Sequence, residues 1–193
     1  MLNGYISYTG PANFTLKNSY IATKSPVETD YSVIWLKGLS PCNPNDGKTQ
    51  NWLHYNNTIS LPIWDGTKRY IDLYSIFEAT QHRQINYTVQ ANTWKDISYT
   101  WFSGFHLLLY CPLSTVNLID NLFDNYTCVD ELAWMDVERE IFVYNNTFWN
   151  TDHKSYAYIF FNGPHYTYID GLKFENIVGS MTDKINSLVV VNM

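Results

Sequence analysis

Charged residues are scarce in this chain. They make up 16% of its 193 residues, and the formal net charge is −6, with no run of Lys or Arg. Nucleic acids and anionic membranes attract basic surfaces, so this composition argues against both as partners. The three cysteines form no Cys-x-x-Cys pair and no His/Cys cluster, which argues against a structural zinc site.

Helical signals and uninterrupted apolar segments are also rare. The most helix-like stretch, residues 128–140, has ragged apolar spacing. Residues 97–119 carry no Asp, Glu, Lys or Arg and are long enough to span a membrane. They include several polar residues and Pro112, and they fall inside a repeat, so we expect no membrane span. The N-terminus has neither the basic nor the apolar region of a secretory signal.

Aromatic residues are abundant instead. They account for 17% of the chain, and hydrophobic residues as a whole for 46%. Aromatic side chains suit a pleated, half-buried surface. Most of the chain consists of short apolar runs separated by Asn, Gly, Asp and Pro, which is typical of many short strands. We therefore predict an all-β protein, with a loop insertion over residues 40–58, where turn-forming residues are dense.

An internal repeat organises the second half of the chain. Four eight-residue windows align without gaps, and they begin at Val89, Leu118, Val143 and Ile169. The first position is aliphatic, the third forms a turn, the fourth is Asn in three windows, and the sixth is aromatic. The sixth-position residues, spaced by 29, 25 and 26 residues, are Trp94, Phe123, Phe148 and Phe174. This pattern predicts a strand, a tight turn, and a second strand whose aromatics form one inward column. Stacked Asn side chains at the turn would form a hydrogen-bonded ladder.

The repeat resembles a right-handed parallel β-helix. In particular, residues 145–150 look like a coil of extracellular proteins in the broad pectate-lyase-like superfamily. The resemblance covers residues 87–193 well and residues 11–86 poorly. It implies a solenoid with coils of about 25–29 residues, and an irregular β-sandwich is the alternative. Residues 1–193 are expected to be a single β-helix domain or a fragment of a longer one, because no capping sequence follows the last apolar strand.

Five Asn-x-Thr sequons, more than chance predicts, indicate a glycoprotein with an extracellular or cell-surface location. The candidate glycosylation sites are Asn13, Asn56, Asn86, Asn125 and Asn145. Two of them, Asn125 and Asn145, also occupy repeat positions. Because an Asn buried in a ladder cannot carry a glycan, Asn56 and Asn86 are the stronger candidates.

The cysteines leave their pairing open. Cys111 and Cys128 are close enough in sequence to form a disulfide between neighbouring strands. In a secreted protein the odd Cys42 then has a partner outside this chain or is a free thiol. Three unpaired buried thiols are the alternative.

No catalytic constellation is recognisable. The tripeptide at residues 150–152 resembles the first element of the polygalacturonase signature, but the other elements are absent, and Asp152 is interpreted as a turn residue. Acidic residues that could align on neighbouring coils and bind calcium are Asp96, Asp124, Asp136, Asp152 and Asp170. Solvated turn acids are the favoured interpretation of this set. We therefore expect no cofactor, with calcium as the alternative, and an enzyme is not the favoured class.

Tyrosines alternate in two segments, at Tyr156, Tyr158, Tyr166 and Tyr168. Alternation with a period of two places such side chains on one face of a strand. Exposed tyrosines can stack on sugars or on a flat protein surface, although packing in the core is the favoured interpretation.

The favoured function is therefore a secreted or cell-surface structural or adhesive glycoprotein. It would act by self-association into fibres or arrays, or by contact with another surface protein. The alternative is a β-helix protein that binds or cleaves a polysaccharide. Cleavage would require carboxylates converging with Lys or Arg in one groove.

Overall fold

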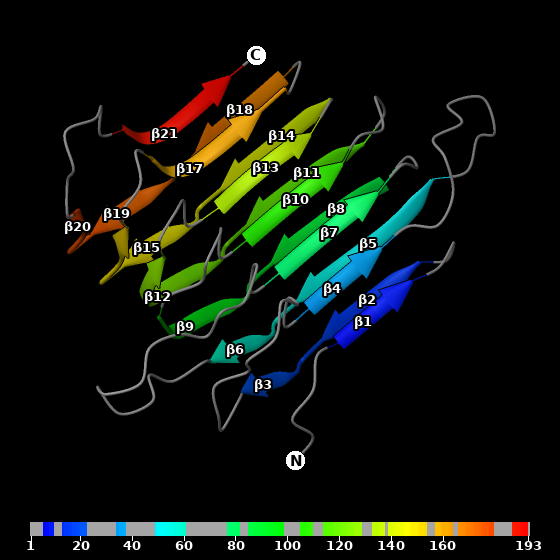
Figure 1. Ribbon diagram of the computed structural model, residues 1–193, viewed down its shortest axis with the longest axis horizontal. Helices are drawn as coiled ribbons and strands as arrows, with labels where there is room; N and C mark the ends of the chain where they lie inside the picture. Colours follow the sequence, from blue (N-terminus) through cyan, green and yellow to red (C-terminus); the bar gives the residue numbers. More distant parts are fainter. Residues whose placement is uncertain are drawn as a thin grey trace.

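The computed structural model contains only β-strands and connecting turns in the residues that it describes (Figure 1). These are residues 6–9, 13–22, 34–37, 49–60, 77–81, 85–98, 105–109, 114–128, 133–137, 139–153, 157–163, 166–179 and 187–192. Within these ranges no helix is long and apolar enough to cross a membrane.

The chain forms a series of coils, and each coil contributes strands to the same three sheets. One sheet contains β1 (Ile6–Thr9), β4 (Ile34–Lys37), β7 (Phe77–Gln81), β10 (Phe105–Leu109), β13 (Ala133–Val137), β17 (Ala157–Asn162) and β21 (Ser187–Asn192), in that order. The second contains β2 (Phe14–Lys17), β5 (Gln50–Tyr55), β8 (Ile85–Gln90), β11 (Thr115–Ile119), β14 (Glu140–Tyr144) and β18 (Tyr166–Asp170).

The third sheet contains β3 (Tyr20–Ala22), β6 (Thr58–Ser60), β9 (Thr93–Ser98), β12 (Leu122–Cys128), β15 (Thr147–Trp149) and β19 (Lys173–Glu175), and the short strands β16 (Asp152–His153) and β20 (Val178–Gly179) extend it. We call these sheets A, B and C. Every described strand pair is parallel, and successive strands visit A, B and C in turn, so the predicted all-β parallel β-helix solenoid is confirmed. The β-sandwich alternative is wrong.

Coil length differs between the two halves. Equivalent positions are separated by 29, 25 and 26 residues in the later coils, as the repeat predicted. In the earlier coils the separations are 38 and 35 residues. Two strands, β5 and β6, occupy most of residues 50–60, so the loop predicted over residues 40–58 is wrong for residues 50–55 and for Thr58. Residues 40–48 lie outside the described residues.

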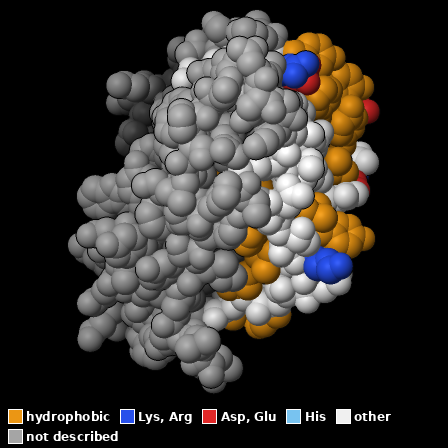
Figure 2. Space-filling view, turned by 90° about the vertical axis from the view of Figure 1, so that its right-hand side faces the viewer, with side chains coloured by type: hydrophobic (Ala, Val, Ile, Leu, Met, Phe, Trp, Pro, Cys, Tyr) orange, Lys and Arg blue, Asp and Glu red, His pale blue; other side chains and the backbone are white. Residues whose placement is uncertain are grey.

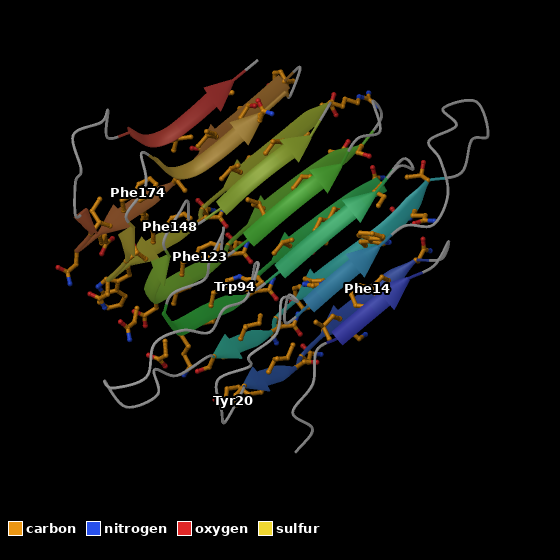
Figure 3. The ribbon with its side chains drawn as sticks, viewed as in Figure 1. Phe14, Tyr20, Trp94, Phe123, Phe148 and Phe174 are labelled. Carbon is orange, nitrogen blue, oxygen red and sulfur yellow. The ribbon has the colours of Figure 1, made fainter. Side chains whose placement is uncertain are left out.

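The predicted aromatic column runs through the interior beneath sheet C (Figure 3). Trp94, Phe123 and Phe148 are buried, and their rings stack at centroid separations of 6.0 and 4.5 Å with interplanar angles of 8° and 1°. Phe174 continues the stack from the last described coil at 5.1 Å and 16°. A strand spacing of about 4.8 Å brings equivalent rings into contact in successive coils, so the parallel register itself creates the column.

A buried ladder of asparagines lies at the corner between sheets B and C. Its members, each about 1% exposed, are Asn57, Asn92, Asn121 and Asn146. The backbone N–H and the side-chain Nδ2 of Asn92 both donate to the Oδ1 of Asn121, at 3.0 and 3.1 Å. Asn121 donates in the same way to Asn146, at 3.0 and 2.9 Å. The Nδ2 of Asn121 also donates to the backbone oxygen of Val89 at 2.8 Å. The amides of Asn57, Asn92 and Asn121 are thus bonded to the coils on both sides, whereas the Nδ2 of Asn146 donates to the backbone oxygens of Leu118 in the preceding coil and Tyr144 in its own.

The residue before each ladder member, and the equivalent residue in the first and last described coils, has a left-handed backbone. Five of these corner residues are not glycine: Asn18, Asn56, Ala91, Asp120 and Asn145, with φ between 51° and 55°. Asn and Asp tolerate this region better than other side chains do, which explains their frequency here. The sixth corner residue is Gly171 (φ 66°), where an added Cβ would collide with the Oδ1 of Asn145.

The ladder generates the first testable prediction. Asn121→Asp keeps the size and the Oδ1 acceptor, but it loses the two Nδ2 donations and places a buried carboxylate oxygen against two other oxygens. We expect the free energy of unfolding to fall by about 3 kcal/mol or more. Chemical denaturation at pH 7 measures it. Asn86→Asp is the matched control on an exposed strand position and should change stability by less than about 0.5 kcal/mol. Equal effects of the two substitutions would contradict the ladder's role.

Candidate functional site: an outward aromatic face

Four aromatic side chains form a cluster on the outer surface of sheet B. Strands β14 and β18 lie side by side, and Ile141 and Val143 of β14 are buried in the interior. Side chains alternate between the two faces of a strand, so Phe142 and Tyr144 point outward, with Tyr166 and Tyr168 opposite Glu140 and Phe142. We call Phe142, Tyr144, Tyr166 and Tyr168 the aromatic face.

The rings of the aromatic face contact one another without stacking flat. The centroids of Phe142 and Tyr166 are 5.8 Å apart at 54°, and those of Tyr144 and Tyr168 are 5.2 Å apart at 37°. Tyr166 is 49% exposed and Tyr168 is 39% exposed. The favoured interpretation that these two tyrosines pack in the core is therefore wrong. Figure 2 shows hydrophobic side chains gathered along one edge of the described surface, with polar atoms between them.

Few charges surround this cluster. The outward positions of β11 are Thr115, Asn117 and Ile119, and those of β14 and β18 add only two carboxylates, Glu140 and Asp170. Glu140 faces the guanidinium of Arg139, with 3.6 Å between its Oε1 and the arginine Nε. The described surroundings of the aromatic face therefore offer hydroxyl, amide and carboxylate groups, with the one described arginine already paired.

The last described coil is a second exposed apolar feature. Strands β18, β19 and β21 each stand at the end of their sheet. Val143 is 1% exposed, whereas Ile169, which pairs with it from β18, is 38% exposed. Phe174 is likewise only half-buried, in contrast to Phe148. No described strand of sheet B or sheet C packs beyond β18 or β19, so Ile169 and Phe174 are more exposed than their equivalents one coil earlier.

All five candidate glycosylation residues are exposed. Asn56 and Asn145 are left-handed corner residues immediately before ladder members, and Asn125 is a left-handed residue at the next corner. Asn125 is exposed and lies outside the buried ladder, and its Nδ2, the atom to which a glycan would be attached, donates to the Oδ1 of Asp96 at 3.0 Å. Asn86 points outward from β8, and the Oδ1 of Asn13 accepts a hydrogen bond from the backbone of Asn51 at 2.9 Å.

The alternative in which acidic residues align on neighbouring coils is not seen for Asp96, Asp124 and Asp170. Asp124 pairs in register with Lys95, one position away from Asp96, and Asp170 lies in a different sheet opposite Tyr144. Among the described residues no group of three or more His, Cys, Asp or Glu side chains could hold a metal ion.

Several predicted residues cannot be placed. Cys42, Cys111 and Tyr156 lie outside the described residues. Cys128, Asp136, Asp152 and Tyr158 belong to strands, but their side chains are outside the description. The Cys111–Cys128 disulfide therefore stays a prediction.

His54 is the one described histidine whose side chain can be located, and it is in the core. It is fully buried on β5, with ring centroids 5.6 Å from Phe14 and 5.7 Å from Tyr87. Burial lowers the pKa of His54 to about 3, and burial also raises the pKa of Tyr87 well above its usual value. A neutral, buried imidazole of this kind belongs to the packing of the solenoid.

No protein-family model, curated protein or solved structure matches this chain significantly. The assignment of the fold therefore depends on strand topology and register, and the evidence for function comes from the exposed surfaces.

Sequence reasoning missed two features that the structure reveals. Asn57 and Ile59 continue the ladder and the aromatic column into the earlier coils, with the same spacing of two residues that separates Asn92 from Trp94. That local spacing was a usable signal, but the longer coils hid it. His54 offered no such signal, because the sequence alone does not indicate whether a single histidine in a strand points outward or inward.

The burial of His54 predicts a specific pH dependence. In the unfolded chain its pKa is near 6.5, whereas in the folded chain it is about 3. Between these two pKa values only the unfolded state binds the proton. The stability that the neutral, buried His54 contributes is therefore present above pH 6.5 and is lost as pH falls toward 3. We expect wild type to lose about 2 kcal/mol more than His54→Leu between pH 7.5 and pH 5, as measured by urea unfolding. Identical pH profiles for both proteins would rule out a buried neutral imidazole.

Proposed function

We propose that this chain is a structural or adhesive segment of a secreted or cell-surface glycoprotein, acting by self-association into fibres or arrays. The observation that supports this most is the parallel register of all three sheets, because a second copy can add a strand to each sheet through the same backbone pairing. At the edge formed by β18, the last described strand of sheet B, Ile169 is 38% exposed, although its equivalent one coil earlier is buried.

Stacking of a second copy would cover that edge. Strands β21, β18 and β19 end the three sheets on one side, and β1, β2 and β3 end them on the other. Phe14 and Leu16 of β2 are only half-buried at that opposite end. All described strands are parallel, so the first described coil of one copy could pair with the last described coil of another in the way that successive coils pair within one chain. Contacts between two different ends are heterologous, and they generate filaments when they repeat along the solenoid axis without closing into a ring.

The extracellular part of the proposal rests on the sequons and on the resemblance of the coils. The five sequon asparagines are all exposed, so a glycan could extend from each into solvent. A right-handed parallel β-helix of the pectate-lyase-like superfamily is the proposed relationship, and extracellular members of that superfamily include structural fibres and adhesins as well as enzymes.

Sedimentation velocity over a range of concentrations tests self-association. Wild type is expected to form larger species as concentration rises. Ile169→Lys places a charge at the proposed contact and should weaken association by about tenfold or more. Ile119→Lys is the matched control, because Ile119 points outward in the middle of sheet B and should leave association unchanged. The proposal fails if wild type stays monomeric at every concentration, or if Ile169→Lys associates as well as wild type.

Glycosylation is tested separately, in protein secreted from eukaryotic cells. Treatment with a peptide-N-glycosidase is expected to reduce the mass of wild type. Thr58→Ala removes the sequon of Asn56 while keeping the left-handed Asn that the corner favours. It should lower the mass by one glycan, as read by mass spectrometry. An unchanged mass after enzyme treatment would remove the glycoprotein part of the proposal and leave self-association untouched.

The aromatic face favours a second candidate, a carbohydrate-binding β-helix protein. Tyrosine rings present apolar faces with polar hydroxyl edges, as sugar rings do, and they lose little conformational entropy on binding. Polysaccharide cleavage has weaker support, because the predicted acidic residues in the described coils do not align.

A further inference from the structure

We propose that the aromatic face of β14 and β18 binds a chain of neutral sugars. This inference rests on the carbohydrate-binding candidate and is independent of self-association. Its basis is the combination of tilted exposed rings, a small footprint and the absence of any unpaired cation at the described outward positions around them.

The orientation of the rings distinguishes this cluster from the aromatic column inside the solenoid. In the column, Phe123 and Phe148 lie 1° from parallel, so the ring faces cover one another. On the outer surface, Tyr144 and Tyr168 are inclined by 37°, and Phe142 and Tyr166 by 54°. Inclined rings leave part of each π-face uncovered. The apolar face of a sugar ring, with its C–H groups, is a partner that such a surface accepts.

The size of the face argues for a sugar chain over a protein. Adjacent strands are about 4.8 Å apart, and outward residues two positions apart on one strand are separated by about 7 Å. Four side chains on this grid cover an area comparable to one or two sugar rings. A stable protein interface buries about 800 Å² on each partner, several times more than four such side chains offer.

The charges near the face select the class of sugar. Glu140 is next to Tyr166 in the strand register but faces Arg139, and Asp170 lies at the end of β18. At the described outward positions of β11, β14 and β18, uronic acids and sulfated sugars would meet these carboxylates, and the neighbouring Arg139 is paired with Glu140. Neutral sugars carry hydroxyl donors that carboxylates accept. Asn117, in register with Phe142 on the neighbouring strand β11, adds an amide for further hydrogen bonds.

The test compares binding to neutral and acidic polysaccharides. Wild type would be incubated with cellulose, chitin, mannan and mixed-linkage β-glucan, and with polygalacturonate as the acidic comparison. Retention by at least one neutral polymer is expected, with no binding to polygalacturonate. Tyr166→Ala/Tyr168→Ala should weaken that binding by about tenfold or more. Tyr20→Ala is the matched control, because Tyr20 is 69% exposed on β3, in the first described coil.

A second variant guards against loss of folding. Tyr166→Phe/Tyr168→Phe keeps the rings and should retain binding within a few-fold, whereas both double variants should keep the β-sheet circular dichroism of wild type. The proposal is overturned if no neutral polymer binds, if polygalacturonate binds better, or if the alanine variant binds as wild type does. It is also overturned if the alanine variant loses its folded signal and the phenylalanine variant loses binding.

The two proposals fail independently. If the aromatic face binds sugar, Ile169→Lys should keep polysaccharide binding, and the alanine double variant should still associate in the ultracentrifuge. Loss of association in the alanine double variant without any sugar binding would identify the face as a contact between copies of the chain, and would overturn this inference.

Discussion

The buried amide ladder is the constraint from which the rest of the structure follows. An Asn side chain in the interior must have partners for both its oxygen and its nitrogen, because an unsatisfied buried polar group is costly. Here most of these partners lie in neighbouring coils, so Asn92, Asn121 and Asn146 are satisfied only when the coils are in one register. A slip by one residue would set each ladder amide against a corner residue or a strand residue of the next coil in place of its Asn partner, and would turn every inward side chain outward.

The same constraint accounts for part of the sequon excess. A corner needs a residue that tolerates a left-handed backbone, then the ladder Asn, then a residue suited to starting a strand. Asn, Asn and Thr meet these needs, and this is the sequence at Asn56 and at Asn145. An Asn-x-Thr triplet thus arises from the fold itself at these two corners. The sequons at Asn13 and Asn86, which are not corner residues, carry more independent weight for glycosylation.

How far the sequence predicts the structure depends on coil length. Where coils have 25–29 residues, the inward column from Trp94 to Phe174 is visible as a repeat, and the solenoid follows from it. In the first half, longer coils separate equivalent residues, so Asn57 is hidden although its local context is the same. The outward direction of Tyr168 was deducible, because it adjoins Ile169, which aligns with the inward Val143. Its exposure was not deducible, because that depends on what covers the sheet.

The coil edge at Ile169 and the aromatic face point in different directions, so both can be used at the same time. The coil edge at Ile169 faces along the axis on which coils stack, whereas the aromatic face points sideways from sheet B. Stacking of copies through their edges would leave each aromatic face exposed and would repeat it along the filament. A single face of four rings can hold a sugar chain only weakly. A row of such faces converts weak contacts into avidity, because each later contact is made within an already bound chain. A stacked solenoid with a small sugar-binding face on each copy therefore needs no deep pocket to adhere strongly to a polymeric carbohydrate.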